Sequence, residues 1–514
     1  MRKVKILIGE PIAQEAVAQM RAGGAQVDSL AQLGGGSPEE IIDQYEGLVV
    51  GQMMQVDDAL LARASKLAVI GKIGKDTSNI DMAAATRAGI AIVNTSQGVS
   101  ASLAEYNILA MLTLARLGTD KGQLGRELKG KTLGIIGLGN VGAQVAKRAK
   151  AFDMRVICYD PSVSRARAMV CEVELMDLVD VLVLSDFVTI HVPLNEETRG
   201  LINKDNLSLM RQGAFLVNTA EPEVCDLDAV VQALAEGRLG GVAMDFPGGH
   251  EAAREKLAAS PRAIITANQA AATAEARVGT AQEVVAEMLT YCQTGYSKNA
   301  INIPLLKESQ RNAMQSARRL ALTLGDFIGQ LVTKPLETVS ITYCGDMASY
   351  DEAPLTQWAL LALLGHVTTD KINYVNASAW AKEQGISVNV RQDAERGDYQ
   401  SSMRIEVTSG GETKLIAGQI RSGGELRLIQ IDGFAMDTRP EPHFLLIPHE
   451  NKPGMLGQYD VNISGMVVGR QQAEDHQVAM MVMTIAQPVS DEVLTALGAT
   501  EGILDVQSID LQRI

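Results

Sequence analysis

Residues 131–161 read KTLGIIGLGNVGAQVAKRAKAFDMRVICYDP, which is the order of a strand, a glycine-rich turn, a helix and a second strand that ends in an acid. Gly137 permits the tight turn, Gly139 lets backbone N–H groups approach a pyrophosphate, and Gly142 lets the helix lie close to the first strand. The helix is expected to begin near Val141, where unpaired N–H groups and the helix dipole favour negative charge. The stretch therefore predicts a dinucleotide-binding turn.

The acid at the end of this stretch indicates which dinucleotide is bound. Asp160 follows Gly142 by 18 residues, at the end of the apolar run 156–159. Its carboxylate can accept hydrogen bonds from the adenosine ribose hydroxyls, whereas it would repel a 2′-phosphate. NAD is therefore the predicted cofactor, in preference to NADP.

The composition limits the classes of protein to which the chain can belong. Its 514 residues predict three or four domains, and 46% hydrophobic against 21% charged residues is typical of a globular protein. A net charge of −15 argues against nucleic acid and anionic membrane surfaces as partners. No apolar run approaches the roughly 18 residues of a membrane span, and the start MRKVKILIGEP has no signal-peptide pattern. We expect a cytoplasmic protein.

The cysteines give no sign of a metal site or a disulfide framework. They stand at positions 158, 171, 225, 292 and 344 and form no CxxC or metal-spaced cluster. Reduced thiols are the simplest interpretation, and no metal is expected.

The order of predicted elements indicates two parallel-sheet domains followed by two of another kind. In the first hundred residues the strands VKILIG, GLVVG, LAVIGK and IAIVN alternate with helices, and a helix at 100–117 leads into the glycine-rich unit. Such alternation predicts doubly wound parallel sheets. From about 305 the pattern changes to helices and then to hairpins with Gly-Gly turns, and a mixed unit follows over 443–514. The predicted fold class is α/β, with two Rossmann-like domains followed by smaller α+β domains.

The chain resembles the long form of the D-3-phosphoglycerate dehydrogenase family, within the D-2-hydroxyacid dehydrogenases, in ELKGKTLGIIGLGNVG, CYDP, HVPLNEETRGLIN, NAINIP, SSMRIEVTSGGE, RLIQIDGF and HENKPGMLGQ. The resemblance implies a substrate-binding domain at 1–97 plus 283–303 and an NAD-binding Rossmann domain at 98–282. It implies an intervening domain at 304–435 and a βαββαβ-like ACT regulatory domain at 440–514. It also implies an oxidoreductase of the serine-biosynthesis type that acts on a small-molecule substrate, and a homo-oligomer.

The resemblance further implies which residues contact the cofactor. Besides the three glycines and Asp160, they are Asn140, Val141, Pro161, Thr219, Ala220 and Asp245.

Three positions depart from the family where its chemistry should lie. In LVNTAEPEV, Glu221 takes the place of the family's substrate-binding arginine, and in AIITANQAAAT, Asn268 takes the place of its acid/base histidine. His250, in DFPGGHE, takes the place of the glutamate that orients that histidine. A carboxylate about 4 Å from a substrate carboxylate would repel it by ~1 to 4 kcal/mol, and asparagine cannot exchange a proton near pH 7. We expect impaired or altered substrate chemistry.

Positive charge is also reduced around the expected substrate cleft. Where the family has Arg-Ser after GLVV, this chain has Gly51 and Gln52, and where it has an arginine and a Gly-Thr-Gly turn, this chain has Lys72 and GKD at 74–76. Gln52, Lys72 and Lys75 are the candidate substrate contacts. A solvated turn is the alternative interpretation of the two lysines.

The C-terminal unit and one subunit interface depart as well. His449, Asn451 and Asn462 resemble the family's serine-binding residues, but the run GQYDVNIS is too short for the first helix of an ACT domain. A segment that carries an interface tryptophan in the family is missing between Leu114 and Leu128. We therefore expect an altered regulatory site and an altered interface.

Three of the candidate residues also have an ordinary structural interpretation. Glu221 could be a solvated loop acid, His250 a surface histidine, and His191 in HVPL a structural histidine. Alternatively, His250 hydrogen-bonded to Asn268 would return one titrating group to the cleft.

Three functions are consistent with these residues. The first is an NAD-dependent oxidoreductase of the resembled family with impaired or altered substrate chemistry. The second is a catalytically inactive NAD-binding paralogue that regulates or assembles with an active one. The third is another NAD-assisted reaction that uses His250 or Lys72.

Overall fold

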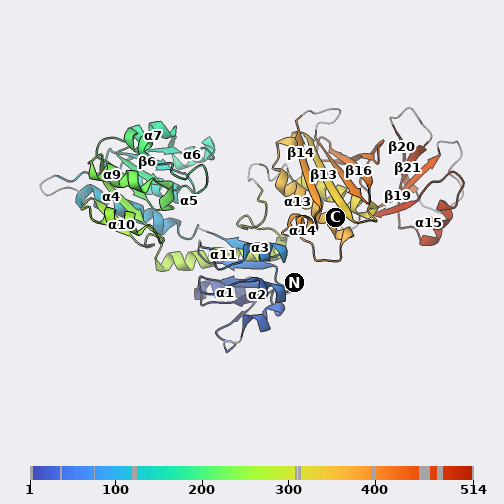
Figure 1. The fold of residues 1–514 in the computed structure, drawn as a ribbon, viewed down its shortest axis with the longest axis horizontal. Helices are drawn as coiled ribbons and strands as arrows, with labels where there is room; N and C mark the ends of the chain where they lie inside the picture. Colours follow the sequence, from blue (N-terminus) through green and yellow to red (C-terminus); the bar gives the residue numbers. More distant parts are fainter. Residues whose placement is uncertain are drawn as a thin grey trace.

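The computed structural model describes residues 4–34, 37–74, 76–95, 97–117, 124–306, 310, 314–394, 401–450, 463–471 and 478–511. Within these residues the strands form three sheets. Figure 1 shows the second and third sheets at opposite ends of the molecule, with the N-terminal sheet below and between them. No described helix has the length and hydropathy needed to cross a membrane.

The N-terminal segment forms a parallel sheet in the order β2-β1-β3-β4-β5. Its elements are β1 (Lys5–Ile8), α1 (Gln14–Ala22), β2 (Gln26–Ser29), β3 (Gly47–Val50), α2 (Asp58–Arg63), β4 (Val69–Lys72), α3 (Met82–Arg87) and β5 (Ala91–Asn94). Every residue of β3 and β4 is buried, as expected for a parallel sheet covered on both faces. Asp57 and Asp81 accept hydrogen bonds from the first turns of α2 and α3, which fixes where these helices begin.

The second sheet is also parallel, in the order β12-β11-β10-β9-β6-β7-β8. Its strands are β6 (Thr132–Ile136), β7 (Arg155–Tyr159), β8 (Glu174–Leu175), β9 (Phe187–Ile190), β10 (Ala214–Asn218), β11 (Leu239–Asp245) and β12 (Ala263–Thr266). Its helices are α5 (Asn140–Lys150), α6 (Arg165–Cys171), α7 (Leu178–Leu184), α8 (Lys204–Leu209), α9 (Leu227–Ala235) and α10 (Glu251–Ala258). The chain runs outward from β6 in both directions, so the strand order reverses between β6 and β9, where a doubly wound sheet opens a binding crevice. The predicted fold class is confirmed.

Two long helices join the first two sheets. Helix α4 (Ser100–Leu117) packs against α5, and α11 (Ala274–Thr294) packs against α1 and β4. A Cβ at Gly98 would lie 2.3 Å from the backbone nitrogen of Thr280, so the two connections touch directly. Glu283 accepts hydrogen bonds from Thr95 Oγ1 at 2.9 Å and from Gly98 N at 2.8 Å. These hydrogen bonds tie the segment after β5 to α11.

The third sheet has the order β14-β13-β15-β16-β17-β18-β20-β21-β19-β22. Its strands are β13 (Leu336–Gly345), β14 (Ser387–Asp393), β15 (Ser401–Ser409), β16 (Glu412–Ile420), β17 (Leu426–Ile431), β18 (Phe434–Thr438), β19 (His443–Glu450), β20 (Ile463–Gln471), β21 (Val478–Ile485) and β22 (Gln507–Asp510). Its helices are α12 (Met314–Leu331), α13 (Glu352–Val367), α14 (Ala377–Glu383) and α15 (Asp491–Gly498). The predicted Gly-Gly hairpin joins β15 to β16. Pairing of β18 with β20 makes the sheet continuous, and the shortened helix expected before β20 lies outside the described residues.

Glycine permits the close packing of α12 against α13. A Cβ at Gly325 would lie 2.3 Å from the carbonyl oxygen of Ala359, and one at Gly329 would lie 2.7 Å from that of Leu363. Both contacts are with backbone atoms, which cannot rotate away. The two helices therefore approach each other at a distance that only glycine allows.

We predict that Gly325→Ala lowers the free energy of unfolding by about 1 to 3 kcal/mol, because the added methyl group forces the helices apart. Gly365→Ala is the matched control, since a Cβ at this exposed position of α13 would meet nothing within 4 Å. It should be neutral or raise stability by up to about 1 kcal/mol, since alanine is the better helix former. Denaturant unfolding of both variants measures this, and equal stability of the two would contradict the packing argument.

Candidate functional site

The glycine-rich turn between β6 and α5 has the geometry of an anion-binding loop. Gly137 adopts φ +96°, and a Cβ there would lie 2.9 Å from the backbone of His191. A Cβ at Gly142 would lie 2.1 Å from the carbonyl oxygen of Gly137, so glycine lets α5 start directly against the end of β6. Gly139 caps α5 without a side chain, and a Cβ there would meet nothing within 4 Å. Open space therefore faces the N-terminus of α5, as a bound pyrophosphate requires.

Asp160 lies beside this turn and is held by it. Its Oδ2 accepts a hydrogen bond from Leu138 N at 2.8 Å, and its Oδ1 accepts one from Ser162 N at 2.9 Å. A carboxylate oxygen can accept more than one hydrogen bond, so both retain capacity for ribose hydroxyls. The other expected contacts nearby are Asn140, Val141 and Pro161. These residues fit the NAD that the sequence predicts.

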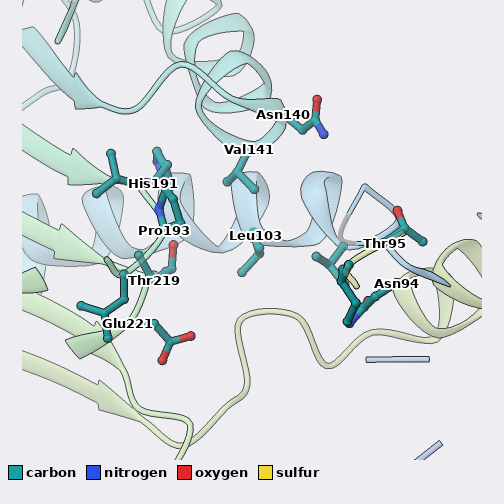
Figure 2. Close-up of a pocket in the computed structure, with 14 residues that line it drawn as sticks. Asn94, Thr95, Leu103, Asn140, Val141, His191, Pro193, Thr219 and Glu221 are labelled. Atoms are coloured by element: carbon teal, nitrogen blue, oxygen red, sulfur yellow. The ribbon is translucent and has the colours of Figure 1, made fainter. Parts of the chain in front are cut away.

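A cavity of about 550 Å³ lies between the first two sheets. It is lined by Asn94, Thr95, Val99, Leu103, Asn140, Val141, His191, Val192, Pro193, Leu194, Thr219, Ala220, Glu221 and Ile301. Figure 2 shows His191, Thr219 and Glu221 along one wall, with Asn94 and Thr95 across the gap. The structure thus brings the predicted residues Thr219, Ala220 and Glu221 together with the start of α5.

Sequence reasoning missed Asn94, Thr95 and Ile301 as parts of this site. Asn94 ends β5 and Thr95 follows it, and polar residues at the end of a parallel strand are a signal that could have identified them. No such signal marks Ile301. Ile301 lines the cavity because the segment around residue 299 returns to the first sheet and bonds to β5. Asn94 N donates to Asn299 O at 3.0 Å.

A chain of buried hydrogen bonds lies behind one wall of the cavity. Asn107 Nδ2 donates to Leu103 O at 2.7 Å and to Thr219 Oγ1 at 3.0 Å, which leaves its Oδ1 to accept from Thr189 Oγ1 at 2.7 Å. Because the single hydroxyl proton of Thr189 is used, its oxygen must accept from His191 Nε2, 2.9 Å away. This assigns the ring proton of His191 to Nε2 and a lone pair to Nδ1.

His191 is therefore a neutral residue with a fixed tautomer. Burial lowers its pKa to about 3, so the ring carries no charge near pH 7. The interpretation of His191 as structural describes only part of its environment, because the same side chain also lines the cavity.

Glu221 follows β10 and is the only charged residue among the described residues that line the cavity. Its turn is held by buried Asn218, whose Oδ1 accepts from Ala220 N at 2.9 Å and whose Nδ2 donates to Glu221 O at 3.3 Å. The residue is partly exposed, and within the described part of the chain its carboxylate has no hydrogen-bond or ion-pair partner. From the described residues, the cavity thus presents one unpaired negative charge and no cation.

His250 lies outside this cavity. Its Nε2 is 3.1 Å from Glu223 Oε1, and the ring lines a separate depression with Arg199 and Asp226. The structure does not support the alternative interpretation in which His250 is hydrogen-bonded to Asn268, because the loop before α10 turns the ring toward Glu223 instead. Asn268 is exposed after β12, with a left-handed φ of +52°.

Asp245, predicted as a cofactor contact, holds the turn after β12. Its Oδ1 accepts from Thr266 Oγ1 at 2.6 Å and from Gln269 N at 2.9 Å, and its Oδ2 accepts from Ala270 N at 2.9 Å. These bonds keep Asn268 at the tip of the turn. A contact between Asp245 and the cofactor stays a prediction.

Lys72 does not offer its charge to the cavity. Its side chain is 0% exposed, its Nζ donates to Gly51 O, and burial lowers its pKa. Glu10 Oε1 accepts from the backbone nitrogens of Gly51, Met53 and Met54 at 3.1, 2.9 and 2.6 Å. The expectation that Lys72 contacts substrate is corrected. Its ammonium group is buried and hydrogen-bonded to the loop after β3, so a substrate cannot reach it.

The other two substrate candidates lie near the same loop. Gln52 is exposed, and a Cβ at Gly74 would lie 3.3 Å from its Nε2. Lys75 lies outside the described residues. Substrate contacts of Gln52 and Lys75 stay predictions.

The predicted regulatory residues are only partly described. His449 in β19 is 5% exposed, and its Nδ1 lies 2.8 Å from Glu450 O. Its buried Nε2 has no hydrogen-bond partner among the described residues. Asn451 and Asn462 lie outside those residues, so the regulatory site stays a prediction.

Comparison with known families identifies two parts of the chain. Residues 112–270 match the NAD binding domain of D-isomer specific 2-hydroxyacid dehydrogenases. Residues 313–432 match the D-3-phosphoglycerate dehydrogenase intervening domain. The first match covers the glycine turn, Asp160 and Glu221, so it supports NAD as the cofactor.

Relatives match over nearly the whole chain. The D-3-phosphoglycerate dehydrogenase of Archaeoglobus fulgidus is 32% identical over 99% of this chain and 100% of its own. That of Synechocystis is 31% identical over 99% of this chain and 95% of its own. Among solved structures, a D-lactate dehydrogenase from Treponema pallidum is 22% identical with a TM-score of 0.51, over 58% of this chain and all of its own. An NAD⁺-bound 3-phosphoglycerate dehydrogenase from Entamoeba histolytica is 24% identical with a TM-score of 0.48, over 59% of this chain and all of its own.

We predict that Asp160→Ala weakens NADH binding by about 1 to 3 kcal/mol, because it removes charged acceptors from the ribose hydroxyls. Calorimetric or fluorescence titration of NADH measures the change. Glu236→Ala is the control, since Glu236 lies at the end of α9, beside the edge where β11 begins and away from the cavity. Unchanged affinity in Asp160→Ala would show that the carboxylate serves only the turn.

Proposed function

This chain belongs to the D-3-phosphoglycerate dehydrogenase family, and we propose that it is an NAD-dependent D-2-hydroxyacid oxidoreductase of that type with impaired or altered substrate chemistry. The observation that carries the proposal is the contrast between the two halves of its site. The glycine turn and Asp160 are complete, whereas the described residues that line the cavity beside them carry a single charge, that of Glu221. Bound NAD would supply the hydride acceptor or donor.

Glu221 disfavours an anionic 2-hydroxyacid. Two carboxylates about 4 Å apart repel each other by ~1 to 4 kcal/mol, depending on how well water screens them. The polar residues Asn94, Thr95 and Thr219 offer hydrogen bonds but no compensating positive charge. A substrate without a carboxylate at this point avoids the repulsion.

Proton exchange is also poorly supported at the cavity. Oxidation of a hydroxyl group needs a base that takes up its proton. His191 is neutral, but with a pKa of about 3 it is a weak base. Asn268 has no proton to exchange near neutral pH, and His250 is paired with Glu223 in a separate depression. These features support slow turnover.

The same weakness favours a second candidate function. A chain that holds NAD but exchanges protons poorly suits a subunit that regulates or assembles with an active paralogue. The third interpretation, another NAD-assisted reaction that uses His250 or Lys72, loses support because His250 lies outside the cavity and Lys72 is buried. Assembly as a homo-oligomer stays a prediction.

We predict that the chain oxidises 3-phosphoglycerate at least ~10³-fold more slowly than its own triple variant Glu221→Arg, His250→Glu, Asn268→His. General acid/base catalysis is typically worth about 10² to 10⁴, and a cation in place of an anion at the reacting group adds to it. The two effects need not add, because such residues act as a unit. NADH formation followed by absorbance measures both proteins.

Titration of NADH into both proteins separates cofactor binding from chemistry. The triple variant should bind NADH with an affinity close to that of the native chain. Robust native turnover would contradict the proposal and show that another residue carries the proton. If neither protein turns over, the result would favour the second candidate function, a subunit that regulates or assembles with an active paralogue.

A further inference from the structure

The strand order determines the direction in which a bound dinucleotide would extend across the site. From Asp160 the carboxyl ends of β7, β6, β9 and β10 follow one another along a single edge of the second sheet. The glycine turn follows β6, His191 follows β9, and Glu221 follows β10. A dinucleotide with its ribose at Asp160 and its pyrophosphate at the start of α5 must extend its nicotinamide half over β9 and β10. That half therefore lies on the side of Glu221.

Among the described residues that line the cavity, Glu221 alone carries a charge on that side, while Asp245, at the end of the next strand β11, accepts three hydrogen bonds from Thr266, Gln269 and Ala270. No described residue pairs with the Glu221 carboxylate. His191 on the same wall is neutral, with its Nε2 proton donated to Thr189. The nearby cation Lys72 is buried and bonded to Gly51 O, so it does not offset the carboxylate at the surface of the cavity.

We infer that Glu221 makes this site select the oxidised cofactor. The nicotinamide ring carries a positive charge in NAD⁺ and none in NADH, so an unpaired carboxylate beside it attracts only the oxidised form. Two unit charges about 6 Å apart, at an effective dielectric constant of about 40, change the affinity by about tenfold. When both forms are present, the chain holds NAD⁺ in preference to NADH. The inference needs NAD binding but no turnover.

The ratio of the two dissociation constants isolates this effect. The adenosine, the ribose units and the pyrophosphate are the same in both cofactors, so their contacts with Asp160 and α5 cancel in the ratio. The charge on the nicotinamide ring does not cancel. A change in the ratio therefore reports the charge near the ring, whereas equal changes in both constants report the shape or stability of the site.

The test measures the dissociation constants of NAD⁺ and NADH by calorimetry on the full chain. Glu221→Gln keeps the size of the side chain and removes its charge, and Glu221→Arg reverses the charge. We expect Glu221→Gln to weaken NAD⁺ about tenfold relative to NADH, with NADH itself changed by less than about twofold, and Glu221→Arg to shift the ratio further. Glu236→Gln is the control, because it removes one charge from the opposite edge of the same sheet, and it should leave the ratio unchanged.

Salt gives a second measurement that needs no variant. Raising NaCl from 0.05 to 0.5 M should lower the native preference for NAD⁺, because ions screen the carboxylate. The inference is overturned if the native ratio is independent of salt, or if Glu221→Gln folds with a native melting temperature and leaves the ratio unchanged. A native chain that binds neither form also overturns it. If the variants fail to fold, the salt titration alone decides.

Discussion

The contact between Gly142 and the carbonyl oxygen of Gly137 is the constraint on which the site depends. Any side chain at position 142 would place a carbon 2.1 Å from that oxygen, so glycine alone lets α5 begin directly at the end of β6. The first N–H groups of α5 then face open space instead of protein. The same turn receives Asp160, whose carboxylate bonds to Leu138 N and so ties the end of β7 to the end of β6. These contacts form one end of the sheet edge that borders the cofactor site.

At the other end of that edge, buried polar side chains form hydrogen bonds with one another. Asn107 joins Thr189 and Thr219, and Thr189 in turn takes the Nε2 proton of His191. The hydrogen bonds of this chain fix the tautomer of His191, and burial keeps its ring neutral. Glu221 lies beyond the chain and has no partner in the described residues. It is therefore the residue whose charge acts on whatever occupies the cavity.

Two residues that chemistry made plausible as reactive groups have structural partners instead. Lys72 is buried in the first sheet and holds the loop after β3, while Glu10 holds the same loop from its other side. His250 is held by Glu223 in a separate depression. A charged or titratable group that is removed from water needs a partner. In this fold the nearest partner of each of these two side chains belongs to a loop and not to a substrate. The same polar residue types therefore serve structure at these positions.

The sequence by itself determined the features that depend on neighbours along the chain. The spacing of Gly137, Gly139 and Gly142 and the acid at 160 predicted the turn, and the alternation of apolar strands with helices predicted both parallel sheets, because these patterns record local backbone needs and burial. Only the tertiary structure decided which distant segments meet. Asn94, His191 and Glu221 stand far apart in sequence and line one cavity because parallel strands end at a common edge and because the two connections between the sheets touch at Gly98 and Thr280. The partners of Lys72 and His250 were decided in the same way, since a hydrogen bond to a remote loop leaves no pattern in the sequence.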